Sequence, residues 1–425
     1  MSFLLLIVII LISLGMAQFK PFWLVFFFMI TAVMPNIAFA TTPFWNEEYA
    51  QITRGFYVYD VILLAMMIVM IPRWWKERHR MGVKVRRLFD SFFFFLGWLF
   101  FEIIRNIPQY GLSSFGEFRY EYLMLVMPIY VALYFKDESI QKRLLGLIKF
   151  YIFFLPILVF PIVGSLKGFQ FGSQDRFYTA AIEIGYPLGI LLLLVRQKYL
   201  KTIEFNIFYI FSLVFIVIIM LIDSHRSVMI SVVIGFFIYI LLGKVKISFR
   251  MIAAILVLTA VGVYVLSLIG FNYQYDFISR IQAYTQPEND ETSKWRLELW
   301  TVLMVDILKK PWTGSGFGGW WNIYVPEINQ NITATPHSFY MQSLSRIGVI
   351  GLFLYLVFIY RCTIYFFQIY VIKIIKNNYN KVAAVIGIIT IIIMHVFFIT
   401  YTPVYYILII LGYSIATSLD IHSTS

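Results

Sequence analysis

The chain has 425 residues, of which 61% are hydrophobic, 19% aromatic and 13% charged, and its formal net charge is +12. Soluble domains carry roughly 25% charged residues, so this composition excludes an ordinary soluble protein and indicates a membrane protein. The positive charge does not indicate nucleic-acid binding, because the basic residues lie in loops between apolar segments rather than on a water-facing domain.

Apolar segments long enough to cross a bilayer recur along the whole chain. A transmembrane helix needs roughly 17–25 residues. We therefore expect an all-α polytopic membrane protein with about 12–13 transmembrane helices. In chain order the predicted spans are residues 2–18, 21–40, 56–72, 88–107, 120–136, 144–165, 177–195, 206–222, 227–243, 249–270, 338–372, 382–400 and 403–418.

The basic loops predict the orientation, because Lys and Arg are retained on the cytoplasmic side. Segment 73–87 is the richest of them. Smaller basic clusters lie in residues 136–149, 196–201, 244–250 and 373–381. The outer face then holds the loops 41–55, 108–119, 166–176, 223–226 and 271–336.

Loop 271–336 is the large outer region of this topology, and loops this long usually carry function or are disordered. Within it, residues 292–310 are predicted to form an amphipathic helix with Leu299, Leu303 and Ile307 on one face. The glycine-rich stretch that follows ends the helix. We therefore predict that this loop folds against the membrane.

A histidine and several arginines fall on the predicted outer face. His337 stands at the mouth of the span 338–372, and imidazole can take and give a proton near neutral pH. A guanidinium group suits phosphate oxygens because it is a rigid and permanently charged fork of donors. The outer arginines are Arg176, Arg226, Arg280 and Arg296. Each could instead pair with a neighbouring acid, such as Asp175, Asp223 or Glu298, or meet lipid headgroups, but several beside one histidine favour an anion site.

The histidine belongs to a spaced motif of His337-Ser338, nine residues, Gly348, two residues and Gly351. This motif resembles, at every defined position, the signature of the bacterial O-antigen ligase and O-antigen polymerase superfamily. Positions 337 and 348 are about three helical turns apart, so we expect His337 and Gly348 on nearly the same face of one helix. The two glycines are expected to let a neighbouring helix approach closely.

Three further features resemble the same superfamily. They are a short turn with Ser and Arg at 224–227, an Arg followed by a Trp at Arg296 and Trp300, and a Pro-x-x-Gly-x-Gly-Phe-Gly stretch at 311–318. The resemblance covers roughly residues 170–415. It divides the chain into amino-terminal transmembrane helices, 1–170, and a catalytic membrane domain, 171–425, which includes loop 271–336.

The resemblance implies a GT-C-type glycosyltransferase of the bacterial cytoplasmic (inner) membrane, acting in O-antigen or surface polysaccharide biosynthesis. Such an enzyme moves a glycan from undecaprenyl diphosphate to a sugar hydroxyl on the periplasmic face. The acceptor is the lipid A core in a ligase, which the form of the histidine motif slightly favours, or another lipid-linked repeat in a polymerase. Membrane lipids and other polysaccharide-assembly membrane proteins are further expected partners, whereas nucleic acid is not.

The site residues that the resemblance implies are assigned position by position. His337 matches the essential histidine, which would activate or orient the acceptor hydroxyl. Arg226 and Arg296 match the arginines that would bind the diphosphate, and Arg176 is a weaker match. The supporting residues are Ser338, Gly348, Gly351, His225 and Arg280. The turn reads Ser-His-Arg-Ser where relatives often have Ser-Arg-Gly, which leaves the role of His225 open.

Other polar residues have plainer interpretations. Glu102 and Arg105 are spaced for a structural i,i+3 ion pair. Arg346 is expected to serve packing or a separate pair, and His395 to be a core histidine. The acidic run 288–291 lacks the alternating ligands and turn glycine of a calcium or magnesium loop. We predict metal-independent transfer without a cofactor.

Two alternatives come from other functional classes. A flippase or transporter for lipid-linked oligosaccharides would also have about twelve helices, but should show repeated halves and broken helices near the bilayer midplane. A purely structural scaffold would not account for a histidine and several arginines on one face. Transport moves the lipid intact, whereas transfer releases polyprenyl diphosphate, so the products separate these classes.

Overall fold

The structure is a computed structural model, and it describes most of the chain. The described residues are 3–40, 51–53, 56–111, 113–154, 184–201, 226–243, 264, 291–318, 323–325, 330–332, 337–371 and 378–419. Of the predicted spans, 206–222 and nearly all of 249–270 lie outside these residues. The site residues Arg176, His225 and Arg280 also lie outside them.

Helices dominate the described residues. They are α1 (Phe3–Phe19), α2 (Pro21–Ala40), α3 (Val58–Glu77), η2 (Arg78–Arg80), α4 (Val83–Tyr110), α5 (Ser113–Glu121), η3 (Leu123–Val126), α6 (Met127–Tyr134), α7 (Glu138–Phe153), α10 (Gly185–Leu200), α12 (Arg226–Gly243), α15 (Glu291–Lys309), α16 (Phe339–Val371), α17 (Asn378–Phe398) and α18 (Tyr405–Leu419). The remaining eleven predicted spans each coincide with described helix over all or part of their length. Within the described parts of the chain, three helical segments are long and apolar enough to cross a membrane by themselves: Val58–Arg80, Phe339–Val371 and Asn378–Phe398.

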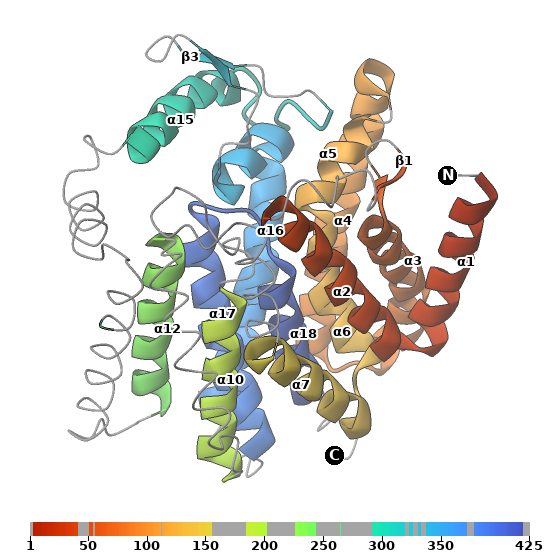
Figure 1. The fold of residues 1–425 in the computed structure, drawn as a ribbon, viewed down its shortest axis with the longest axis vertical. Coiled ribbons are helices and arrows are strands. Elements are labelled where there is room, and N and C mark those ends of the chain that lie inside the picture. The colour runs from red at the N-terminus through yellow and green to blue at the C-terminus, as the bar shows by residue number, and fades with distance from the viewer. Residues whose placement is uncertain are drawn as a thin grey trace.

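Helix α16 lies at the centre of the bundle (Figure 1). It packs against α4 from the amino-terminal third and against α17, while α17 also contacts α12, α10 and α18. Helix α15 lies across the end of the bundle at which α16 begins, beside the strand β3 (Ile323–Val325) (Figure 1). The predicted division at residue 170 stays a prediction, although contacts between α4 and α16 and between α6 and α18 cross it.

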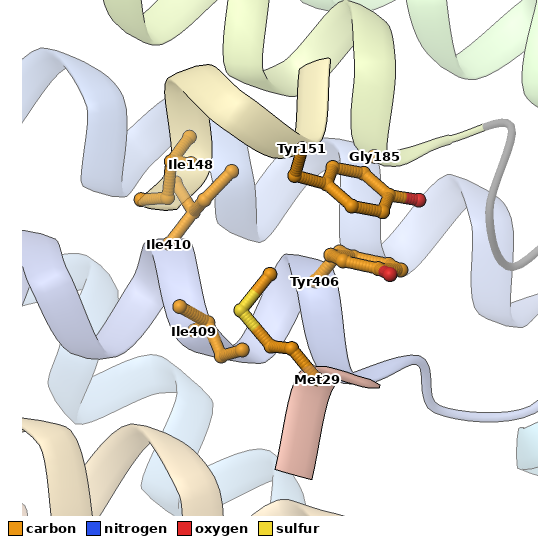
Figure 2. A pocket seen from close by; sticks show the side chains of 7 residues that line it. All are labelled: Met29, Ile148, Tyr151, Gly185, Tyr406, Ile409 and Ile410. Atoms are coloured by element: carbon orange, nitrogen blue, oxygen red, sulfur yellow. The ribbon is translucent and has the colours of Figure 1, made fainter. Parts of the chain in front are cut away.

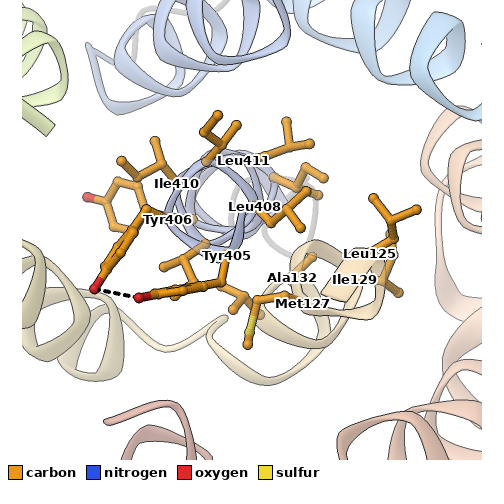
Figure 3. Close-up of a cluster of buried hydrophobic side chains, with 14 of the residues drawn as sticks. Leu125, Met127, Ile129, Ala132, Tyr405, Tyr406, Leu408, Ile410 and Leu411 are labelled. Carbon is orange, nitrogen blue, oxygen red and sulfur yellow. Dashed lines mark hydrogen bonds between the residues drawn. The ribbon is translucent and has the colours of Figure 1, made fainter. Parts of the chain in front are cut away.

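The contact between α18 and α6 shows how the bundle interior is packed (Figure 3). Apolar side chains such as Ile129 and Leu408 are buried there, and the hydroxyl of Tyr405 donates to that of Tyr406 over 3.0 Å. A Cβ at Gly412 would lie 2.7 Å from Val131 and 2.9 Å from Pro128. The absence of a side chain at Gly412 therefore allows the two backbones to approach, which is the usual basis of helix association in membranes.

A small apolar pocket lies between α2, α7, α10 and α18 (Figure 2). Its lining is Met29, Ile148, Tyr151, Gly185, Tyr406, Ile409 and Ile410. The rings of Tyr151 and Tyr406 stack with their centroids 3.7 Å apart. The lining contains none of the histidines or arginines that the sequence singles out, so the candidate site must be sought elsewhere.

Two local features of the outer loops depart from the sequence analysis. Helix α5 occupies most of the predicted loop 108–119. Two antiparallel hairpins are also present, one of β1 (Gln51–Thr53) with β2 (Phe56–Tyr57), and one of β3 with β4 (Gln330–Ile332). Each strand has only two or three residues, so the architecture remains that of a helical bundle.

Candidate functional site

The turn that carries His337 is fixed at the start of α16. The backbone N–H of Phe339 donates to the carbonyl of Tyr401 over 3.1 Å, and the hydroxyl of the buried Ser338 accepts from the N–H of Met341 at 3.4 Å. His337 itself has a φ of 47°, a left-handed conformation that is rare outside glycine. Strained backbone of this kind persists where the surroundings determine it, and it clusters at functional sites.

Arg296 lies on α15, and its Nε is buried without a hydrogen-bond partner among the described residues. Glu298, the acid considered as its partner, lies 3.8 Å from Lys294 instead. No ion pair engages Arg296 within the part of the chain that the structure describes. A charged donor in this state can accept an anionic ligand without first giving up a protein partner.

His337 and Arg296 act on each other electrostatically. Burial lowers the pKa of the half-buried His337 imidazole, and the positive charge of Arg296 lowers it further. Both effects disfavour the charged imidazolium form. His337 is therefore neutral at neutral pH and able to accept a proton, with a guanidinium group close enough to influence it.

The start of α12 lies close to the same turn. Arg226 is the first residue of α12, and the hydroxyl of the next residue, Ser227, is hydrogen-bonded to that of Thr400. Thr400 precedes Tyr401, which holds the backbone of Phe339. The turn between α17 and α18 thus anchors both the chain at Arg226 and the chain at His337.

Helix α16 is broken at Gly348, which has a φ of 64° and a ψ of −174°. The expectation that His337 and Gly348 lie on one face of a continuous helix is therefore wrong, because His337 precedes the helix and Gly348 interrupts it. The break separates a short first segment, 339–347, from the long second segment, 349–371. A helical pattern in the sequence does not reveal such a break, since glycine is compatible with both arrangements.

The glycine-rich segment 311–318, which we name the splice loop, fills this break. An unbroken helix would join the N–H groups of Val349 and Ile350 to the carbonyls of Ser345 and Arg346. Instead Val349 donates to Pro311 at 2.8 Å and Ile350 to Trp312 at 3.2 Å, while Ser315 donates to Ser345 at 2.7 Å and Gly316 to Arg346 at 2.9 Å. The splice loop therefore provides hydrogen-bond partners for these four backbone groups beside the break.

Both motif glycines are required by close contacts. A Cβ at Gly348 would collide with the carbonyl of Trp312 and lie 2.6 Å from the nitrogen of Gly314. A Cβ at Gly351 would lie 2.7 Å from Nε1 of Trp98, which donates to the carbonyl of Ile347 at 3.1 Å. The lack of a side chain at Gly348 thus leaves room for the splice loop, and the lack of one at Gly351 leaves room for α4.

The predicted face of α15 docks this helix on the first segment of α16. Leu299, Leu303 and Ile307 are buried together and pack against Met341 and Leu344. Arg296 lies one turn before Leu299 on α15. Packing of the predicted apolar stripe therefore brings Arg296 toward the turn that holds His337.

Charged residues that the sequence analysis did not connect surround the splice loop. Arg346 forms an ion pair with Glu117 of α5, in agreement with a separate pair for Arg346. Burial raises the pKa of Glu117, while Arg346 and the N–H of Gly318 oppose that shift. The predicted pair of Glu102 and Arg105 is present at 2.5 Å.

Glu117 was missed because segment 108–119 was interpreted as a loop. The sequence carries no clear helical signal there, since charged and aromatic residues alternate over residues 117–121, a period of two that is typical of a strand. His395 meets the hydroxyl of Tyr340 on the neighbouring helix, which fits a core histidine.

Comparison with known protein families gives one result that bears on this site. Residues 211–356 match the family model described as O-Antigen ligase. The matched region contains Arg226, Arg296, the splice loop, His337 and both motif glycines. No curated protein matches the chain significantly. The match through this region, with the histidine motif inside it, supports a similarity to the O-antigen ligase and polymerase superfamily, and the apolar helices of the described residues indicate a membrane protein.

Proposed function

We propose that this protein is a GT-C-type glycosyltransferase of the bacterial inner membrane. It transfers a glycan from undecaprenyl diphosphate to an acceptor sugar hydroxyl on the periplasmic face, as part of O-antigen or surface polysaccharide assembly. The observation that supports this most strongly is the placement of a neutral imidazole, His337, beside a guanidinium group with an unpartnered donor, Arg296.

In this mechanism His337 is the general base. It accepts the proton of the acceptor hydroxyl as that oxygen bonds to the anomeric carbon of the donor glycan, and the bond from that carbon to the diphosphate oxygen breaks. General-base catalysis of this kind contributes roughly 10²–10⁴-fold to a rate. A pKa below the usual value keeps the imidazole ready to accept at neutral pH.

Arg296 stabilises the leaving diphosphate in the same step. Negative charge develops on the phosphate oxygens as the bond breaks, and fixed donors in a water-poor site stabilise such charge strongly. Arg226, at the start of α12, and Arg176 are proposed as further diphosphate ligands. The transfer is proposed to need neither a metal nor a cofactor, so it should proceed in the presence of a chelator.

The acceptor distinguishes two forms of this activity. We favour a ligase that delivers the glycan to the lipid A core, because the histidine motif fits the ligase form of the pattern. A polymerase would extend another lipid-linked repeat with the same base and the same diphosphate site. In a deletion strain, loss of all O-antigen would indicate a ligase, whereas retention of a single repeat would indicate a polymerase.

A lipid-linked oligosaccharide flippase is the alternative from another class. Broken helices are also a feature of transporters, in which they present open backbone groups to a substrate. Here the splice loop takes up the backbone groups at Ser345, Arg346, Val349 and Ile350. This break therefore supports a fixed site better than a transport path.

The two classes are separated by reconstitution of the full-length protein in proteoliposomes. The donor carries one label in the glycan and another in the polyprenyl chain. Transfer moves the glycan label to the acceptor and leaves labelled polyprenyl diphosphate. Movement of both labels together across the bilayer, without glycan on the acceptor, would refute the proposed function.

A further inference from the structure

The splice loop is held by ion pairs from the amino-terminal helices. We propose that the ion pair between Glu117 of α5 and Arg346 of α16 positions the splice loop and thereby sets the placement of Arg296 against His337. Glu117 and Arg346 are then positioning residues. The inference deepens the proposed function and, for its catalytic meaning, rests on it.

Helix α15, the splice loop and the first segment of α16 form one unit. Helix α15 ends at Lys309, and the N–H of Gly314 returns to the carbonyl of Lys310 at 2.9 Å. The splice loop then hydrogen-bonds on both sides of Gly348, and the apolar face of α15 packs on the first segment of α16. This unit carries Arg296 on one part and adjoins His337 on the other, so a shift of the loop changes their separation.

One ion pair holds three residues of the splice loop. The guanidinium of Arg346 pairs with Glu117 and donates to the hydroxyl of Ser315 at 3.2 Å and to the carbonyl of Gly316 at 3.4 Å. The other carboxylate oxygen of Glu117 accepts from the N–H of Gly318 at 2.7 Å. Removal of the Glu117 charge therefore loosens contacts at both ends of this stretch.

A second arginine holds the preceding residues. Arg105 of α4 donates to the hydroxyl of Thr313 at 2.6 Å and to the carbonyls of Thr313 and Gly314 at 3.1 Å each. Glu102 fixes Arg105 through their ion pair. A Cβ at Gly316 would collide with the side chain of Asn106, which shows how closely α4 lies under the splice loop. The amino-terminal helices thus form the platform on which the loop rests.

The burial of the Glu117–Arg346 pair favours a positioning role over a contribution to stability alone. The two side chains are only 15% and 5% exposed. A buried ion pair is often no more stabilising than well-packed apolar residues would be, because both charges lose hydration. What the pair supplies is a set of directional hydrogen bonds to defined loop atoms, and these fix a position as apolar contacts cannot.

The test measures the environment of His337 directly. Full-length protein in nanodiscs is treated with diethylpyrocarbonate between pH 5 and 8, and modification of His337 is followed by mass spectrometry. The reagent attacks the neutral imidazole, so the pH midpoint of modification reports the pKa of His337. Among the described residues, Arg296 on α15 is the charged group that acts on His337, and the surrounding elements also carry Tyr340 on α16, His395 on α17, Tyr401 on the following turn and Arg226 at the start of α12.

The expected result is an upward shift of the midpoint in Glu117→Gln of about 0.5 pH unit or more, because the Arg296 charge moves away from His337. Arg296→Gln should shift the midpoint in the same direction. The double variant should shift it no further than Arg296→Gln does, since Glu117 acts through Arg296. Glu138→Gln is the matched control, because it removes the same charge from an exposed ion pair with Lys142.

A folded Glu117→Gln protein with the wild-type midpoint would overturn the inference, whatever its melting temperature. Should that variant not fold, the pH midpoint of His337 modification is measured in Glu117→Asp and Arg346→Lys. A raised midpoint supports the inference, and the wild-type midpoint overturns it. The measurement needs no glycan transfer, so it decides the positioning role even if the proposed function is wrong. If the proposed function is right, Glu117→Gln also lowers kcat by roughly 10–100-fold, the scale expected for a small misplacement of a catalytic group.

Discussion

The two ends of the bundle use charge in opposite ways. At the end where α3 turns into α4, the ion pair of Arg78 and Asp90 is partly exposed, and that of Lys142 and Glu138 on α7 is largely exposed, at 69% and 65%. At the other end, Arg346 and Glu117 are nearly buried and bind loop atoms as well as each other. Helix α4 connects the two ends, and its 28 residues at about 1.5 Å each are long enough to do so.

This difference separates the charged residues that orient the protein in the membrane from those that serve its function. Exposed ion pairs contribute little to folding stability because solvent screens them, and a basic surface is what cytoplasmic loops need for membrane orientation. Loss of one partner from a buried pair costs roughly 3–5 kcal/mol, because a charge is left unpaired. Substitutions of the buried charges at the end with His337 should therefore have large effects, and substitutions in the exposed ion pairs small ones.

The largest effect is expected for His337→Ala. Transfer should fall by roughly 10²–10⁴-fold, because the base that accepts the acceptor proton is lost. The measurement is surface polysaccharide in a strain whose only copy of the gene encodes the variant, with membrane abundance and melting temperature as controls for folding. Glycan at the wild-type level would remove His337 from the mechanism.

Arg296→Ala should follow, with a loss of roughly 10²–10³-fold in kcat from weaker stabilisation of the leaving diphosphate. Lys294→Ala is the matched control, because Lys294 lies on the same helix with an exposed side chain. Initial rates on the lipid-linked donor compare the two variants. Equal rates for both would show that no special role belongs to Arg296.

Gly348→Ala tests the break in α16 itself. The new Cβ would meet the splice loop, and the left-handed φ would cost about 1–3 kcal/mol in backbone strain alone. We expect a lower melting temperature together with lower activity. Gly15→Ala is a suitable control, because a Cβ there would meet nothing within 4 Å. Equal stability of the two variants would contradict the observed fit of the splice loop.

The pH dependence of kcat/KM gives a smaller but diagnostic effect. Only the neutral imidazole can accept a proton, so activity should rise with pH through the pKa of His337 and be lost below it. Burial and Arg296 both lower this pKa from 6.5, so the acid limb should lie below pH 6.5. An acid limb above that value would mean that the charged form is favoured in the site.

Glu138→Gln should have the smallest effect. Its ion pair with Lys142 is exposed, and solvent screens it. Melting temperature and transfer rate should match those of the wild type. A large change in either quantity would contradict the distinction between exposed ion pairs, which contribute little, and the buried pair at the other end of the bundle.

The sequence was sufficient for the parts of the molecule that depend on local pattern. Long apolar runs predicted the helices, and the stripe of Leu299, Leu303 and Ile307 predicted the buried face of α15. The motif spacing also singled out the splice loop and the glycines Gly348 and Gly351, which lie together in the structure. These features follow from periodicity and composition along a short stretch of chain.

The remainder depends on partners far away in the sequence. Glu117 and Arg346 are 229 positions apart, and nothing local to either residue identifies the other. The break at Gly348 was predicted as continuous helix, because only the splice loop makes an interrupted backbone favourable there. The left-handed turn at His337 is likewise imposed by contacts with the turn between α17 and α18.

The most direct test of the account separates binding from chemistry at His337. Purified wild-type and His337→Ala proteins in proteoliposomes receive a doubly labelled lipid-linked donor with acceptor present, and bound donor and released polyprenyl diphosphate are measured in a single turnover. The account predicts that His337→Ala binds the donor as the wild type does and releases no diphosphate on that timescale. Release at the wild-type rate would contradict it.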